Sequence, residues 1–380
     1  MKRILISAVA AGALLGQLSA FEVVNDGEKS LSVFGAAKAV VGYGYNFSQG
    51  TAKGSKVVRG AYPSEFIYGI QGNSRIGLSF TYGKLFGAAL LGAGESTFYG
   101  NSTNNGGFRQ LYAGYDFGDM GKILAGKNEI ATSMGGFSSS IFDTESGLQG
   151  FGGTSTSTRR FQIAYMLDGF TISVSENDVN NFDKQGGNKS IPRFNVSYDY
   201  KADGLVAKVA ASYTNASRKA TQHIALVTAG AKYNLGDAGY VSGLLTYGLN
   251  SQLVGESKVA LPTLSRGFGN VGVSGGTDIG GTSNNTHIAS VAVEYGTNLT
   301  DDLKFIVGGG YQYATHAKKG DTPTANGLDG QLHSYSAFIQ TPYNVGGGFS
   351  IIPQVGYLGT TAYKTNTGNV LAEVLFNLVF

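Results

Sequence analysis

Apolar and polar residues alternate in many segments along the chain. In 66–82, apolar side chains fall mostly on even positions and polar ones on odd positions. A period of two is typical of a β-strand whose two faces meet different surroundings. The same alternation recurs in 30–47, 160–167, 193–200, 205–213, 288–295 and 303–313. The pattern predicts an all-β protein built from long, two-faced strands.

The connections between these segments are of two kinds. Short turns are expected near 82–84, 118–121, 168–169, 201–204, 236–239, 298–302 and 344–348. Long, polar loops are expected near 48–62, 96–106, 129–158, 177–191, 214–221, 250–285, 314–331 and 359–368. Transmembrane β-barrels combine short turns at one end with long loops at the other, and their strand number is even. We therefore expect a transmembrane antiparallel β-barrel of about 16 strands, wide enough for an aqueous channel.

The C-terminal segment VLAEVLFNLVF supports this prediction. Counting back from Phe380, every second side chain is apolar. One face of the last strand is therefore apolar up to the end of the chain, as expected for a closing strand that faces lipid. A soluble β-sandwich or solenoid with one wet face is the alternative, but it does not explain this strand and its strands would be shorter.

The N-terminal segment has the features of a secretory signal peptide. Lys2 and Arg3 precede an apolar stretch that is too short to span a membrane, and small residues follow. We expect cleavage after Ala20. The expected organisation is a signal peptide over 1–20 and a single barrel domain over 21–380.

Composition excludes several classes of protein. The net charge of +3 gives no basic footprint for nucleic acid, and the absence of cysteine excludes disulfides and thiolate metal sites. The segment GFGNVG (267–272) matches a dinucleotide fingerprint by its letters, but it lies in a long polar loop without the strand-to-helix context. No metal-ligand spacing joins the histidines, so we expect surface histidines and no cofactor. The histidines are His223, His287, His316 and His333.

Several motifs resemble those of the general bacterial porins, the trimeric diffusion channels of Gram-negative outer membranes. NSRIGLSF (73–80) is similar to a Ser-Arg-φ-Gly-φ stretch of that family, where φ is apolar. The segment 108–127 resembles its Arg-x-x-φ-x-Gly-φ strand with a short turn and a Gly-Arg ending, and 159–167 resembles the strand after the third loop. The middle of the chain matches only in pattern. The resemblance implies a homotrimer in the outer membrane that passes small hydrophilic solutes and ions by passive diffusion.

The resemblance also implies a constriction, because the third long loop of such porins folds into the barrel. That loop is 129–158 here, and it contains acidic residues but no basic residue before Arg159. The alternation within their strands predicts that most of the candidate bases point away from lipid. Lys127 is placed at the constriction only by the resemblance, at a position where the family usually has arginine. The candidates are the loop acids Asp143 and Glu145 and the barrel-wall bases Lys38, Arg75, Lys127 and Arg160. Arg109, in phase with Leu111, is expected at the outer rim.

Other interpretations of these residues remain. The bases could simply be solvated in a wet lumen, and the acids could lie on an ordinary surface loop. A solute- or anion-selective channel of the same fold is the nearest functional alternative, given the inward bases. An outer-membrane barrel enzyme or adhesin is the alternative from another class. We expect no enzyme, because no local nucleophile–base arrangement is visible in the sequence.

Overall fold

The computed structural model describes residues 20–50, 65–71, 73–92, 95–96, 102–103, 107–141, 159–177, 191–217, 221–251, 285–316, 331–362 and 365–380. The expected signal peptide lies almost wholly outside these residues. Within them, no helix is long and apolar enough to cross a membrane. The strands are β1 (Phe21–Asn25), β2 (Lys29–Gly50), β3 (Glu65–Ile70), β4 (Arg75–Tyr82), β5 (Leu85–Gly92), β6 (Glu95–Ser96), β7 (Ser102–Thr103), β8 (Phe108–Asp116), β9 (Lys122–Glu129), β10 (Arg159–Leu167), β11 (Phe170–Ser175), β12 (Arg193–Ala202), β13 (Leu205–Ser217), β14 (Thr221–Asn234), β15 (Tyr240–Leu249), β16 (Thr286–Asn298), β17 (Lys304–His316), β18 (Gln331–Gln340), β19 (Tyr343–Gly346), β20 (Phe349–Ala362) and β21 (Thr365–Val379).

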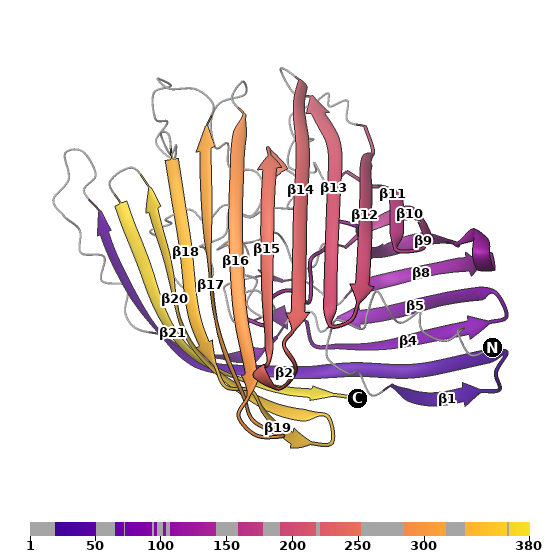
Figure 1. Cartoon of the computed structure of the whole chain (residues 1–380), viewed down its shortest axis with the longest axis horizontal. Helices are drawn as coiled ribbons and strands as arrows, with labels where there is room; N and C mark the ends of the chain where they lie inside the picture. Colours follow the sequence, from indigo (N-terminus) through magenta and orange to yellow (C-terminus); the bar gives the residue numbers. More distant parts are fainter. Residues whose placement is uncertain are drawn as a thin grey trace.

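The strands close into one antiparallel barrel. From β4 to β18 each barrel strand pairs with the next one along the chain, and β20 and β21 complete the series. The ring closes where β2 pairs with β21, from Ala36 opposite Val379 to Gly50 opposite Thr365. With β3 and β4 taken as two parts of one strand, this is the expected barrel of 16 strands. Figure 1 shows the strands following one another around the barrel, with the turns β12–β13, β14–β15 and β16–β17 at the same end.

The two chain ends meet along β2. The backbone N–H of Gly35 donates to the carbonyl of Phe380 at 2.7 Å, and Phe380 N–H donates back to the Gly35 carbonyl at 3.1 Å. Beyond this point β1 takes over the same edge of β2, with Phe21 opposite Val33. The C-terminal strand is therefore the closing strand, as its alternating pattern predicted. No backbone edge is left open at this seam, which lipid requires.

One predicted strand is interrupted. The segment 66–82 forms β3 and β4, with a break at 71–74 opposite Lys38. The hydroxyl of Ser74 accepts a hydrogen bond from Lys38 N–H at 3.0 Å and donates to the Lys38 carbonyl at 3.1 Å. The side chain thus replaces ladder bonds that the break removes. Apolar residues keep the same face on both sides of the break, so the predicted phase is confirmed.

Two loops are shorter than the sequence predicted. The segment 214–221 was expected to be a loop, but β13 and β14 pair as far as Ser217 opposite Thr221. Likewise, β20 and β21 pair as far as Ala362 opposite Thr365, inside the expected loop 359–368. Beyond the apolar band both faces of a strand meet water, so polarity there ceases to distinguish strand from loop.

The outer face carries the apolar side chains and the inner face the polar ones. On β15 and β16, Leu245 and Val293 are each 61% exposed, whereas the alternate residues Thr246 and Glu294 are only 6% exposed. Exposed large apolar residues on this scale are typical of a surface that faces lipid rather than water. The inner face carries most of the buried polar side chains, together with apolar ones such as Leu244 and Leu375.

Three histidines form a repeated arrangement at the start of β14, β16 and β18. The hydroxyl of Tyr213 lies 2.7 Å from His223 Nδ1, and that of Tyr247 lies 2.6 Å from His287 Nδ1. The third pair, Tyr311 with His333, has the same geometry at 2.6 Å. Each tyrosine is at least 40% exposed on the outer face. These surface histidines are therefore paired across strands, near the end where interfacial aromatic residues are expected.

Candidate functional site

The first part of the third loop lies inside the barrel. Ser139 N–H donates to Glu294 Oε2 at 2.8 Å, and Ile141 N–H donates to Gln354 Oε1, also at 2.8 Å. Glu294 and Gln354 belong to β16 and β20, where they alternate with outward apolar residues. The segment 130–141 therefore rests on the inner wall across from β9, the strand it leaves. The predicted insertion of this loop holds for its described part.

Apolar packing anchors the same segment. Met134 and Phe137 are buried against Ala210 of β13 and Leu244 of β15. The Phe137 ring covers Gly230 of β14 so closely that a Cβ there would lie 2.7 Å from it. The Phe137 carbonyl also accepts a hydrogen bond from Ser242 at 2.8 Å. The inner wall of β13–β15 is thus shaped to hold this segment.

Glu294 is the centre of a small polar network. Its Oε1 accepts a hydrogen bond from the Tyr240 hydroxyl at 2.6 Å, while its Oε2 accepts from Ser139. The ammonium group of Lys232 lies 3.8 Å from the centroid of the Tyr240 ring, a cation–π distance. A buried carboxylate needs such partners to offset its lost hydration. The alternation in 288–295 puts Glu294 on the polar face, but only the fold shows that it holds the inserted segment.

Three of the predicted wall bases lie on the inner face. Lys38 pairs with Asn377 of β21, and Arg75 pairs with the buried Ala36 of β2. Arg160 pairs with the buried Asn128 of β9. Each is half-buried and out of phase with its exposed apolar neighbours on the same strand.

Lys127, by contrast, is on the outer face, so its predicted place at the constriction is wrong. It pairs with Phe161 of β10 and Leu111 of β8, which are 55% and 49% exposed. Paired residues on antiparallel strands share a face, so the register decides the side. The inner position beside Arg160 belongs to Asn128. The resemblance to a Gly-Arg ending indicated a basic residue at this position, but it did not indicate which face of the strand that residue is on.

The remaining predicted residues are placed as follows. Asp143 and Glu145 lie outside the described residues, so their role stays a prediction. Arg109 sits at a β-bulge, where Leu90 and Leu91 of β5 pair with Gln110 and Phe108. The bulge breaks the phase on which its expected position at the outer rim was based.

Basic residues outnumber acidic ones on the described inner face of the strands. Two of the bases form ion pairs with inward acids: Lys122 with Asp116 at 2.7 Å and Lys208 with Asp199 at 3.9 Å. Strand phase gives the following inward bases: Lys38, Arg75, Lys122, Arg160, Arg193, Lys201, Lys208, Lys232 and Lys304. The corresponding acids are Asp116, Asp199, Glu294 and Glu373. The described wall therefore carries an excess of positive charge.

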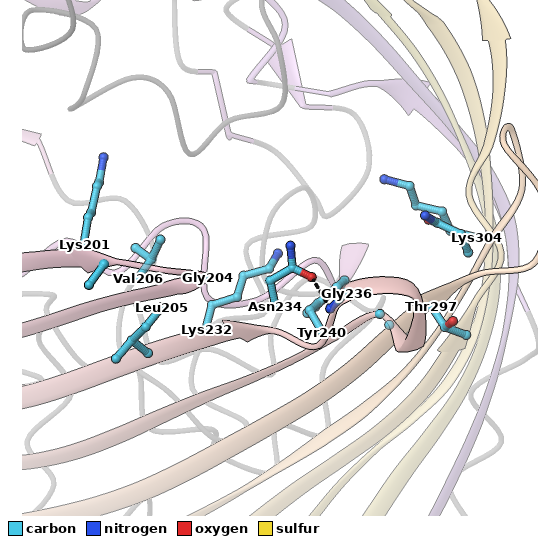
Figure 2. Close-up of a pocket in the computed structure, with 14 residues that line it drawn as sticks. Lys201, Gly204, Leu205, Val206, Lys232, Asn234, Gly236, Tyr240, Thr297 and Lys304 are labelled. Atoms are coloured by element: carbon cyan, nitrogen blue, oxygen red, sulfur yellow. Dashed lines mark hydrogen bonds between the residues drawn. The ribbon is translucent and has the colours of Figure 1, made fainter.

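A cavity of about 690 Å³ opens at the short-turn end of the inner wall. It is lined by residues near the turns β12–β13 and β14–β15 and by the ends of β16 and β17. Figure 2 shows its lysines Lys201, Lys232 and Lys304 spread across the cavity, with Asn234 between the last two. In the part of the chain that the structure describes, no group of three or more acidic or histidine side chains is placed to hold a metal ion.

The fold matches solved outer-membrane channels. The outer membrane channel DcaP of Acinetobacter baumannii matches with a TM-score of 0.61 at 14% identity, over 94% of this chain and 99% of that chain. An anion-selective porin from Comamonas acidovorans gives a TM-score of 0.58 at 17% identity, over 93% and 100% of the two chains. A trimer form of OmpT, an outer membrane protein of Vibrio cholerae, gives 0.53 at 12% identity, over 91% and 99%.

These similarities define the fold as a porin-type β-barrel. No family model matches the sequence, and no curated protein matches it at a significant level. The likeness is therefore one of architecture, and the function must be argued from the residues.

Proposed function

We propose that this protein is a porin, a passive diffusion channel for small hydrophilic solutes and ions across the outer membrane of a Gram-negative bacterium. The observation that carries the proposal is a closed barrel of 16 strands with an apolar outer face and a charged inner face. Barrels of this size leave an aqueous lumen, whereas smaller ones are filled by side chains. A polar, charged inner wall is useful only where water and solutes reach it.

The charge of the inner wall supports a preference for anions. Fixed charges of one sign concentrate counter-ions in a narrow aqueous passage. Three of the lysines on the inner face, Lys201, Lys232 and Lys304, line a cavity, and no carboxylate is among its described lining residues. The Comamonas porin of the same fold is described as anion-selective. The argument for this chain stands on its own wall residues.

The constriction is proposed to lie where the inserted segment crosses the lumen. Segment 130–141 rests on β15, β16 and β20. Lys38, Arg75 and Arg160 face the lumen from the other strands. We assign Asp143 and Glu145, which follow this segment in the chain, to the opposing acidic side. A field across the pore would then orient solutes that carry a dipole.

The proposed functional unit is a homotrimer. The trimer form of OmpT supports an assembly of this type for the fold. Outward side chains of β2 and β21 around the seam, such as Val41 opposite Val374, would supply the contact between subunits. Channels that close in three equal steps would support it, whereas single steps with a monomeric mass in native detergent would contradict it.

No observation on the described residues favours a barrel enzyme. The described histidines His223, His287 and His333 bond to tyrosines on the outer face, away from the lumen. A general base would have to reach a nucleophile at the lumen or the rim. Labelling of the pure protein by a serine-directed covalent probe would support the enzyme alternative.

Planar-bilayer recordings in asymmetric KCl test the channel and its charge together. We expect stable conductance and a zero-current potential on the anion side. Neutralising Arg75 and Arg160 to Gln should shift that potential toward cations, and changing Asp143 to Asn with Glu145 to Gln should shift it toward anions. Lys127→Gln is the matched control, because Lys127 faces outward and its loss should leave the potential unchanged. A folded protein without conductance would refute the channel.

A further inference from the structure

The lysine-lined cavity at the short-turn end has the size and position of a solute site. Its volume of about 690 Å³ lies within the range of small-molecule sites, roughly 300–1,000 Å³. It is formed where the ends of β12, β14, β16 and β17 lie near each other on the inner wall. Solutes that leave the lumen at this end pass the cavity mouth.

The polar groups that line the cavity are mainly hydrogen-bond donors. Lys201, Lys232 and Lys304 contribute ammonium groups from three different strands. Asn234 uses its Oδ1 to accept the backbone N–H of Gly236 at 3.0 Å. Figure 2 shows that its amide nitrogen is then directed to the same side as the end of Lys232. Several cationic donors around one cavity favour a ligand rich in negatively charged oxygen atoms.

None of the described residues that line the cavity is a carboxylate. Asp203 and Asp237 lie on the adjoining turns. Their neighbours Gly204 and Gly236 line the cavity, but the two aspartates are not among its lining residues. On the wall near Lys232, Glu294 uses its two oxygens to accept hydrogen bonds from Tyr240 and from the inserted segment. On β12, Asp199 forms an ion pair with Lys208.

Lys232 is also held in place. It is half-buried, and its ammonium group lies 3.8 Å from the ring centroid of Tyr240, which is itself fixed by its bond to Glu294. A fixed lysine beside two exposed lysines can bind an anion while the exposed side chains adapt to the ligand. We propose that this cavity binds a small polyanionic solute, such as a tricarboxylate, before it leaves the channel. The inference rests on the proposed channel function, because a solute from outside the cell reaches the cavity through the lumen.

Binding can be measured separately from conductance. Citrate is titrated into the detergent-solubilised protein in a calorimeter, with acetate as the monoanion for comparison. We expect saturable citrate binding and much weaker acetate binding. The variant Lys201→Gln/Lys232→Gln/Lys304→Gln should weaken citrate binding at least about tenfold, since binding by clustered charge depends steeply on their number.

A charge-matched control separates local from general electrostatics. Lys29, Lys84 and Lys127 lie outside the cavity, on the outer face or a turn, and changing all three to Gln alters the net charge equally. This control should retain citrate binding. If the cavity variant fails to fold, the double variant Lys201→Gln/Lys304→Gln, which changes only exposed side chains, is compared with the control Lys84→Gln/Lys127→Gln.

Equal citrate affinity in the cavity variant and the control, or no saturable binding in the natural protein, would overturn the inference. Neither result would touch the proposed channel, which stands or falls on bilayer conductance. Conversely, saturable citrate binding without conductance would support the anion site in the cavity and contradict the proposed porin function.

Discussion

The outer and inner faces of β13–β17 are built from alternate residues of the same strands, yet the side chains on the two faces are stabilised by different surroundings. On the outer face, Leu245 and Val293 touch no buried core and are stable only if lipid covers them. On the inner face, Leu244 and Glu294 are buried beneath the inserted segment. Two adjacent residues of one strand can therefore lie in different surroundings, one on the lipid-facing surface and the other in a packed interior.

This contrast teaches where a substitution should change stability and where it should change transport. Outer-face substitutions act through the free energy of insertion, because each side chain there exchanges water for hydrocarbon. Inner-face substitutions act on the attachment of segment 130–141 and on the charge seen by passing ions. The following changes test that division, from the largest expected effect to the smallest.

Phe137→Ala should release the inserted segment. It removes the ring that packs on Gly230, Met134 and Leu244, and loss of a buried Phe side chain costs about 3–5 kcal/mol. We expect higher conductance and more open-channel noise, with the barrel still folded. Phe170→Ala, on the exposed outer face, is the control and should leave the current unchanged. Identical noise in the two variants would show that the segment is not held by this contact.

Leu245→Arg should impair folding into lipid vesicles. The residue lies in the middle of β15 on the outer face, where an Arg is expected to cost about 2–4 kcal/mol. Leu299→Arg is the same exchange at the β16–β17 turn and should cost about 0–1 kcal/mol, as near an interface. The difference is measured by urea titration of the folded fraction. Equal costs would mean that the two sites do not differ in membrane depth.

Glu294→Gln should loosen the segment moderately and change selectivity. The carboxylate accepts bonds from Ser139 and Tyr240, and bonds to a charged group contribute about 1.5–3 kcal/mol. Losing an inward negative charge should also move the zero-current potential further toward anions. Glu28→Gln, on the exposed β1–β2 turn, controls for net charge. A shift of the same size in that control would argue against a local effect at Glu294.

Tyr247→Phe should have the smallest effect. It keeps the ring on the outer face and removes only the hydroxyl that bonds to His287, for a loss of about 0.5–1.5 kcal/mol. Urea unfolding in detergent measures the change. Tyr68→Phe is the matched control, since its exposed hydroxyl makes no hydrogen bond within the described residues. Unchanged unfolding in Tyr247→Phe would show that the Tyr–His pairs add nothing to stability.

Much of the barrel could be predicted because a strand between lipid and water must alternate. The closing role of Phe380 and the inward phase of Arg75 and Arg160 follow from that period, whereas the strand number followed from the alternation of short turns and long loops. Lys127 escaped the prediction because its strand is weakly patterned, with Gly126 next to it and Ala125 before it. A resemblance at a single dipeptide cannot decide a face that depends on the register with two neighbouring strands.

The sequence by itself determined most of the outer surface of this protein, because the apolar residues there follow a local period of two that lipid imposes. Tertiary structure decided what meets inside the barrel. Lys201, Lys232 and Lys304 come together only because three turns lie at one end, and Ser139 reaches Glu294 only because the third loop crosses the lumen. Contacts between residues far apart in the chain depend on the closure of the barrel and on the register between strands. The alternation within a single strand determines neither of them.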